Sequence, residues 1–473
     1  MISLSKDILV AGVDSSTQSV KVVIRNAITG ALIRSGRAVH PAGTEVDPEY
    51  WWVALQEAIS LAGGLADVSG ISIGGQQHGM VLLDKEGDVI RPALLWNDTR
   101  SANAASELNS EYAKLNNGGS ISQAVGSRLV AAFTVSKIRW VADNEPENAA
   151  RIAAIALPHD WLSWKLSGSR NLADLFTDRS DASGTGYFDP IAAEYRRDIL
   201  AMALRDEREI VLPKVLGPFD IAAYTSSGLA IGVGCGDNAG AALGVGAAAG
   251  DVVVSLGTSG TAFAVSQTPS QDPRGYVAGF DDATGKFLPL VCTLNAARIL
   301  DAGARILNLS LDEFGMRALS AQPGADGLTL LPYFEGERTP DRPNATGSLT
   351  GLSLSNSTPE NFARAMIEGM LCGLVDAVSQ LESEGVVVSR ILMIGGAAKN
   401  PAIGPIASSL FGKVIYLPEA GEYVADGAAK QIAWALSGLE PQWRTAPMEH
   451  SESAHAPFVL ERYLDMVERT RSW

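Results

Sequence analysis

Two hairpins with hydroxyl-rich turns constrain the fold of this chain more than any other feature. The first covers residues 8–24 and turns through Asp14, Ser15, Ser16 and Thr17, and the second covers 251–265 and turns through Gly257 and Thr258. Each joins two apolar runs typical of strands. Such turns can present N–H groups and hydroxyls to a phosphate, and the Asp14 carboxylate could also hold Mg²⁺. The repetition predicts a duplicated α/β domain with a nucleotide in the cleft between the halves. Plain polar turns that recur by chance are the alternative.

A glycine-rich stretch over residues 234–244 predicts a ligand-binding helix start. It follows an apolar run over 229–233, places Asp237 where an N-cap would stand, and continues in small residues. Glycine permits close backbone approach, and a helix N-terminus favours an anion. Two other interpretations remain. Asp237 could simply cap a surface helix, or Gly234, Gly236 and Ala239 could form the dinucleotide fingerprint of an oxidoreductase. The fingerprint lies in mid-chain and leaves both hairpins unexplained.

Two polar segments in the first half indicate recognition of a sugar or polyol. Gln77 and His78 lie between glycines after a predicted strand at 70–74, and Trp96 precedes an amide and a carboxylate. Amides, imidazoles and aromatic rings are typical of sites for polyhydroxylated ligands. The alternatives are a structural histidine and a core tryptophan. A polar, glycine-containing loop over 177–189 is also long enough to suggest function.

A second glycine turn, in the second half, follows the buried-type strand at 390–394. Gly395 and Gly396 end that strand, and Asn400 precedes a predicted helix start. A flat base and ribose could lie against such a turn, although a plain β–turn–α junction is the alternative.

Length and charge restrict the function classes. A chain of 473 residues predicts more than one domain, and the Gly-rich segment near 246–250 divides it into 1–246 and 247–473. The formal charge of −16 argues against a nucleic-acid or anionic-membrane surface. Three widely spaced cysteines indicate neither a disulfide framework nor a zinc site. No secretory leader or long apolar segment is evident, so we expect a cytoplasmic protein.

Periodicity predicts the remaining elements. We expect a strand over 32–40, mostly helical structure over 102–165, and helices over 48–62, 158–168, 359–384, 427–439 and 457–471.

Longer motifs resemble the FGGY family of carbohydrate kinases, within the actin-like ATPase superfamily. Residues 347–352, followed after eight residues by 361–368, match the family's C-terminal signature, and 133–140 resemble its N-terminal signature. The segments 75–79, 96–98, 180–185 and 336–340 are most similar to the xylulokinase branch. The resemblance covers nearly the whole chain and implies two ribonuclease-H-like domains flanking a central cleft.

The resemblance also implies a reaction and its residues. ATP with Mg²⁺ would phosphorylate the terminal hydroxyl of D-xylulose to give D-xylulose 5-phosphate and ADP, with Asp237 as general base. The implied sugar ligands are Gln77, His78, Trp96, Asp237 and Asn238. The implied nucleotide and metal ligands are Asp14, Thr17, Gly257, Thr258, Gly395, Gly396 and Asn400, with Asp14 at the metal. L-ribulose, D-ribulose and gluconate remain alternative substrates, and a non-catalytic nucleotide-binding module remains an alternative class. The oligomeric state is left open, a homodimer included.

Overall fold

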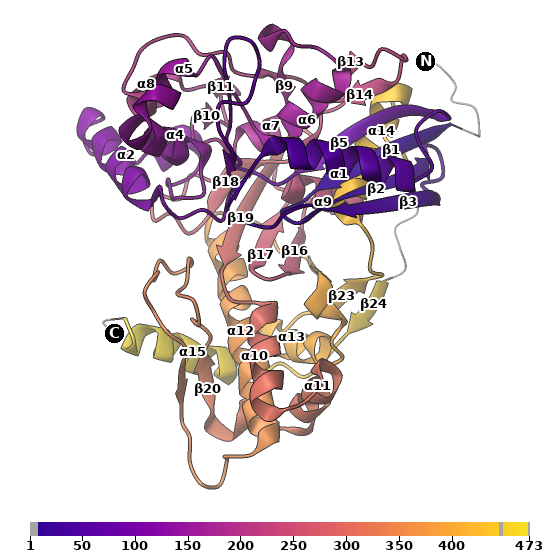
Figure 1. The fold of residues 1–473 in the computed structure, drawn as a ribbon. Coiled ribbons are helices and arrows are strands. Elements are labelled where there is room, and N and C mark those ends of the chain that lie inside the picture. Colours follow the sequence, from indigo (N-terminus) through magenta and orange to yellow (C-terminus); the bar gives the residue numbers. More distant parts are fainter. Residues whose placement is uncertain (1–7, 444–447, 472–473) are drawn as a thin grey trace. The chain divides into compact units, whose positions relative to one another are not determined.

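A computed structural model describes residues 8–443 and 448–471 of the chain (Figure 1). They form two compact units. The first comprises residues 8–246, 267–288 and 421–443, and the second comprises 247–266, 289–420 and 448–471.

The first unit is built on a mixed sheet with the strand order β13-β14-β5-β1-β2-β3, and β15 also pairs with β5. These strands are β1 (Leu9–Ser15), β2 (Ser19–Asn26), β3 (Leu32–Val39), β5 (Val68–Gly75), β13 (Ile221–Tyr224), β14 (Ala230–Gly232) and β15 (Cys235–Gly236). The helices are α1 (Pro48–Leu61), α2 (Ala102–Leu115), α3 (Ser122–Val125), α4 (Thr134–Asn144), α5 (Pro146–Arg151), α6 (Pro158–Ser167), α7 (Arg179–Ala182), α8 (Arg197–Leu204), α9 (Asp237–Val245) and α14 (Tyr423–Ser437). Short strands complete the unit: β4 (Glu45–Val46), β6 (Val81–Leu83), β7 (Ala93–Leu94), β8 (Ala154–Ala156), β9 (Phe176–Thr177), β10 (Phe188–Asp189), β11 (Glu194–Tyr195), β12 (Lys214–Val215) and β18 (Ala278–Asp281).

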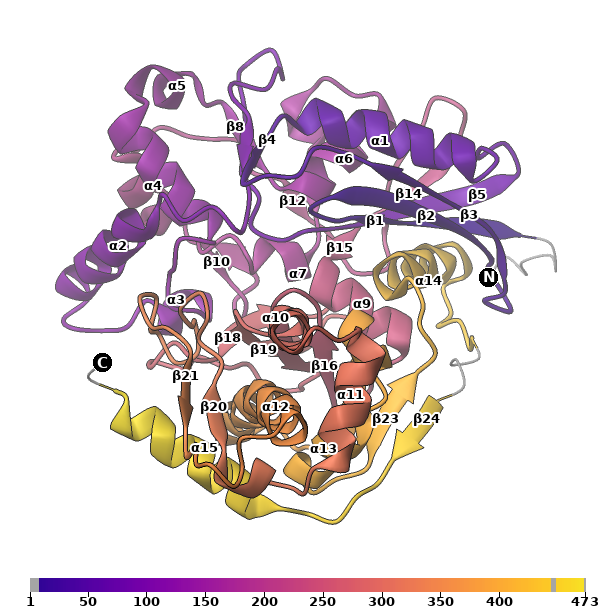
Figure 2. The same ribbon diagram turned by 60° about the horizontal axis from the view of Figure 1, so that its bottom comes forward.

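Successive side chains of a strand point to opposite faces of the sheet, and in this sheet apolar side chains lie on both faces. Val22 on β2 packs in one cluster with Trp51 of α1, whereas its neighbour Val23 packs in another with Ala425 of α14. Figure 2 shows α1 and α14 on opposite sides of β1 and β2. A sheet covered on both faces is expected to have the near-continuous apolar strands seen here.

The expected division at 246/247 is a division along the chain, whereas the first compact unit of the structure also contains residues 267–288 and 421–443. Helix α14 lies against α9 through small residues, and a Cβ on Gly427 would collide with the Gly240 carbonyl. Only a contact distant in sequence reveals this packing. The helix predicted over 427–439 also begins earlier, at Tyr423.

The second unit repeats the central arrangement of the first. An antiparallel hairpin, β16 (Asp251–Leu256) with β17 (Gly260–Ala264), stands beside the parallel strand β22 (Arg390–Ile394), as β1 and β2 stand beside β5. The sheet runs β19-β17-β16-β22-β23-β24. Further elements are β19 (Phe287–Thr293), β20 (Thr329–Leu331), β21 (Ser348–Thr350), β23 (Ile415–Pro418), β24 (Met448–Ser451), α10 (Ala297–Leu307), α11 (Leu311–Ser320), α12 (Pro359–Ser383), α13 (Ile403–Phe411) and α15 (Pro457–Arg469).

Helix α12 is the core helix of the second unit. Its N-cap Thr358 accepts a hydrogen bond from the Asn361 amide, and Pro359 occupies the first turn, where it removes no helical hydrogen bond. Its buried residues, including Met366 and Met370, pack beneath the sheet and against α11 and α13. Across the described ranges 8–443 and 448–471, no helix is long and apolar enough to cross a membrane.

Candidate active site

Three parallel strands of the first unit end side by side and bring the predicted site residues together. Asp14 on β1 and Cys235 on β15 both lie opposite Gly74 of β5. The segments that follow these strands therefore begin at one edge of the sheet, which is where ligands bind in open α/β sheets. Those segments carry Thr17, the Gln77–His78 pair and Asp237.

Asp14 is buried next to the cation of Lys21, with 3.2 Å between Lys21 Nζ and Asp14 Oδ2. Burial raises the pKa of Asp14, and Lys21 partly offsets this. Thr17, three residues later, accepts a hydrogen bond from the Trp96 indole at 3.0 Å. The structure therefore joins a residue of the first hairpin turn to Trp96 of the predicted sugar-binding segments.

Asp237 is the first residue of helix α9, not its N-cap as predicted. Gly236 is the cap, because it still has extended backbone and pairs with Gly75 of β5. Asn238 donates to Asp237 Oδ1 from its backbone N at 2.8 Å and from its side chain at 2.9 Å. Burial, reinforced by the charge of Asp14, raises the pKa of Asp237 to about 7.

Gln77 and His78 are both buried and both bind the segment around α7. Gln77 Nε2 donates to the Ser180 carbonyl at 2.9 Å, and His78 Nδ1 lies 2.6 Å from the Gly184 carbonyl. His78 has a positive φ of 68°, and Thr134 donates to its carbonyl. The interaction of Gln77 with Ser180 indicates that its amide nitrogen orients the loop.

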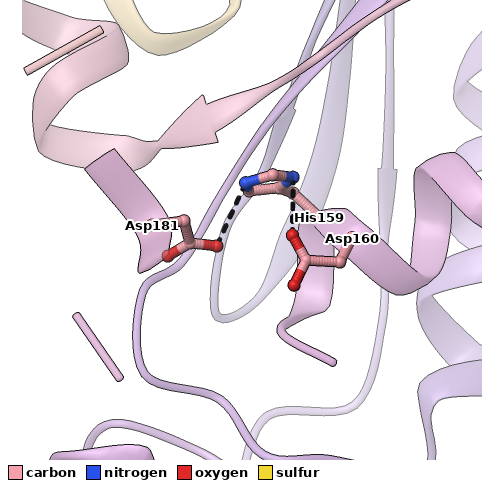
Figure 3. A group of neighbouring side chains, drawn as sticks. All are labelled: His159, Asp160 and Asp181. Carbon is pink, nitrogen blue, oxygen red and sulfur yellow. Dashed lines mark ion pairs between the residues drawn. The ribbon is translucent and has the colours of Figure 1, made fainter. Parts of the chain in front are cut away.

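The turn before Asp237 is supported by residues that no sequence pattern indicates. Gly236 N donates to Ser180 Oγ at 3.0 Å, and the amide of Gln431 on α14 bonds both the N–H and the carbonyl of Gly234. A buried cluster of His159, Asp160, Asp178 and Asp181 lies beside this turn. Figure 3 shows three of its members, His159, Asp160 and Asp181. The polar loop at 177–189 was suspected of function, but nothing in the sequence pairs it with the histidine.

In the second unit, the predicted nucleotide turns follow neighbouring parallel strands. Gly257 and Thr258 come after β16 and are exposed, and Gly395 and Gly396 come after β22 and are exposed. Gly395 has a φ of 100°, and a Cβ there would lie 2.5 Å from the Leu256 carbonyl oxygen. This close approach explains why glycine is required at that position.

Asn400 is buried, and its amide is engaged within the second unit. Its Nδ2 donates to the Leu311 carbonyl at 2.7 Å, and its Oδ1 accepts from Ala402 N at 3.0 Å. These contacts favour a structural role for Asn400 over the predicted contact with adenosine.

Known protein families and relatives match this chain over nearly its whole length. The models of the FGGY family of carbohydrate kinases match with the N-terminal domain at residues 9–256 and the C-terminal domain at 252–436. A protein named xylulose kinase from Streptomyces coelicolor is 41% identical over 457 residues, which cover 93% of this chain and 91% of that protein. Another of that name from Escherichia coli is 31% identical over 94% of each chain.

Among solved structures, the xylulose kinase from Bifidobacterium adolescentis is 48% identical. It aligns with a TM-score of 0.90 over 98% of this chain and 100% of that one. The likeness therefore includes both units.

Proposed function

Because this chain belongs to the FGGY family of carbohydrate kinases, we propose that it transfers the terminal phosphoryl group of ATP to D-xylulose. The products are D-xylulose 5-phosphate and ADP. The choice of D-xylulose as the sugar rests on the 41% identity to a xylulose kinase across 93% of the chain. The geometry supports a sugar kinase. Asp237, whose pKa is raised, lies at the same edge of the sheet as Gln77 and His78, the residues predicted to bind the sugar.

Asp237 is the general base of the proposed reaction. Its carboxylate takes the proton from the terminal sugar hydroxyl as that oxygen forms a bond to the γ-phosphorus, and the bond to the ADP oxygen breaks. A pKa near 7 suits this role, because the group is then both ionised and basic enough at neutral pH. The two hydrogen bonds from Asn238 hold one carboxylate oxygen and orient the other.

His78, Asn238 and Trp96 are the proposed contacts to the sugar hydroxyls. His78 is held by Gly184 on one ring nitrogen, and Trp96 is held by Thr17, so both rings are oriented before the sugar binds. Gln77 contributes by positioning the loop through Ser180.

Within the second unit, the turns of Gly257, Thr258, Gly395 and Gly396 are the proposed nucleotide contacts. Within the first unit, the turn of Thr17 is the proposed phosphate contact. Asp14 fits a magnesium ligand, because it offers a buried carboxylate oxygen whose negative charge raises the pKa of Asp237. When bound, Mg²⁺ would neutralise phosphate charge on ATP. Lys21 contributes a second positive charge next to Asp14.

The proposal is tested by ADP release from Mg-ATP with D-xylulose, L-ribulose, D-ribulose, gluconate and glycerol supplied separately. Turnover with D-xylulose well above the others is the expected result. Preference for another of the sugars would transfer the same chemistry to that substrate and refute the choice of D-xylulose. No turnover with any of them, together with a change of nicotinamide fluorescence on mixing, would favour the oxidoreductase alternative instead.

A further inference from the structure

A histidine outside the proposed reaction lies between carboxylates on both edges of its ring. His159 is fully buried on α6, and its Nδ1 lies 3.4 Å from Asp160 Oδ1. Its Nε2 lies 3.2 Å from Asp181 Oδ2 and 3.4 Å from Asp178 Oδ1. Figure 3 shows the ring between Asp160 and Asp181. A neutral imidazole would turn a lone pair toward one of these carboxylates, whereas an imidazolium presents an N–H group to each.

The burial of the carboxylates makes the charge of His159 important. Asp160, Asp178 and Asp181 are each at most 2% exposed. Within the described part of the chain, neither oxygen of Asp181, nor Oδ1 of Asp160, nor either ring nitrogen of His159 has a hydrogen-bond partner, so the contacts of the ring with these carboxylates are ion pairs. Burial disfavours a charged His159, but the carboxylates outweigh burial and raise its pKa to about 10. A buried carboxylate without a counter-charge is strongly destabilising, and the imidazolium offsets this cost. Burial also raises the pKa of Asp160 to about 6 and that of Asp181 well above its usual value, which reduces the negative charge of the cluster.

The other titratable groups near the cluster are two tyrosines, a cysteine and Asp237. Tyr187, Tyr195 and Cys235 all have raised pKa values through burial, with contributions from cluster carboxylates, so each is neutral at neutral pH. Burial raises the pKa of Asp181, His159 partly offsets this, and the charges of Asp160, Asp178 and Asp237 add to it, so the cluster and the proposed base interact electrostatically. His159 is therefore the group of this neighbourhood that carries positive charge.

A metal ion is a poorer fit than a proton on each nitrogen. A single ion bound by the histidine would need oxygens that converge on one ring nitrogen. Asp178 and Asp181 both face Nε2, but Asp160 faces Nδ1, so the three carboxylates do not converge on one ring nitrogen, although the ligand atoms of His159, Asp160 and Asp181 lie within 4.8 Å of one another. Figure 3 shows Asp160 and Asp181 at different nitrogens.

The cluster connects to the proposed site through the first turn of α7. Asp178 accepts hydrogen bonds from the amides of Ser180 and Asp181 and so fixes that turn. Ser180 in turn accepts from Gly236 N through its hydroxyl and from Gln77 Nε2 through its carbonyl. One serine therefore ties the residue before Asp237 to the loop that carries His78.

The histidine also contacts the Asp237 turn directly. Gly234 has a φ of 87°, and a Cβ at this position would lie 2.7 Å from His159 Nδ1. The ring thus fills the space beneath the turn, and only glycine leaves room for it.

We propose that His159 is a positioning residue, which as a buried imidazolium holds α7 in place and thereby sets Asp237 and the Gln77–His78 loop relative to each other. This deepens the proposed function and rests on it. His159 touches no reacting atom in this proposal and acts through Asp178 and Ser180.

The test compares two variants with a control. His159→Lys keeps a cation in the cluster, His159→Gln removes it, and His450→Gln makes the same change at an exposed histidine. Because a misplacement of about 1 Å can reduce turnover about 100-fold, we expect His159→Gln to lower kcat/KM for the sugar by about that factor. We expect kcat/KM of His159→Lys to be at least about tenfold higher than that of His159→Gln. KM for ATP should stay within about twofold of the wild-type value in both variants.

A second measurement needs no variant. In ¹⁵N-histidine NMR spectra of the wild-type protein, one of the five histidines should keep both ring nitrogens protonated at about pH 8. Equal loss of activity in His159→Lys and His159→Gln, or wild-type activity in His159→Gln, would overturn the proposal. So would a spectrum with every imidazole neutral at that pH, or stoichiometric metal in the purified protein.

Failure of this inference can be told apart from failure of the proposed function. Wild-type ADP release tests the reaction and its sugar, and the variants are compared on whichever sugar the wild type accepts. Thermal unfolding of each variant shows that activity is compared between folded proteins.

Discussion

Replacing Asp237 by asparagine should make the protein more stable while it removes activity. The Asp237 carboxylate lies at the sheet edge that also carries Asp14. Its pKa of about 7 means that its ionisation is disfavoured in the folded protein. Asparagine keeps an oxygen that can accept both hydrogen bonds from Asn238. The substitution therefore removes a disfavoured charge and preserves the local hydrogen bonds.

The magnitude follows from the pKa. A rise from 3.8 to about 7 corresponds to about 4 kcal/mol, at about 1.4 kcal/mol per pKa unit. Asp237 is partly exposed, so solvent screening lowers this and we expect a gain of about 1–2 kcal/mol. Because the folded pKa is raised, the favourable contribution of the protonated carboxyl is complete below pH 3.8 and is lost as the pH rises to about 7. The advantage of the variant should therefore grow between these pH values and stay constant above them.

The assay is thermal unfolding without ligands at a series of pH values, with turnover measured in parallel. Above pH 7 the Tm of Asp237→Asn should exceed that of the wild type by about 3 °C. Its kcat should fall by about 10²–10⁴-fold, the usual contribution of a general base. Asp301→Asn, at an exposed position of α10, serves as the control and should leave both quantities unchanged. A variant no more stable than the wild type above pH 7, or a difference independent of pH, would refute the reasoning.

Four further substitutions test individual contacts. Gly395→Ala should lower the free energy of unfolding by about 2 kcal/mol because of its positive φ, whereas Gly396→Ala, with open space around a Cβ, should leave stability unchanged and raise KM for ATP. Equal melting temperatures for these two would contradict the explanation of the turn. His78→Ala should raise KM for the sugar about tenfold without changing KM for ATP, as measured by kinetics with each substrate varied in turn. An unchanged KM for the sugar would indicate that His78 is structural. Trp96→Phe removes the bond to Thr17 and should reduce kcat/KM about fivefold, and an unchanged value would remove Trp96 from the site.

Elements with local signals were predictable from the sequence. Helix α6 lies within the predicted span 158–168, because Pro158 stands in its first turn and Gly168 ends it with a positive φ of 79°. Both hairpins are confirmed, since alternating apolar residues and a polar turn specify each one. Their repetition predicted a duplicated α/β domain, and the resemblance to the FGGY family implied that its domains are ribonuclease-H-like. The family membership of the chain confirms this fold class.

Features that depend on distant contacts were not predictable. No spacing in the sequence shows that Gly427 packs on Gly240, so the return of α14 to the first unit was missed. His159 and Asp181 likewise belong to separate elements, and a histidine followed by an aspartate is typical of an ordinary helix start. The N-cap at Gly236 was missed because its extended backbone is fixed by pairing with Gly75.

The most direct test of the central claim is the identity of the product formed from D-xylulose. With Mg-ATP and wild-type protein, ³¹P NMR with proton coupling should show one phosphate ester on the terminal carbon for each ADP released. The same reaction with Asp237→Asn should remain close to background. ADP formed without a sugar phosphate, or an ester at another carbon, would contradict the account of Asp237 as the base that activates the terminal hydroxyl.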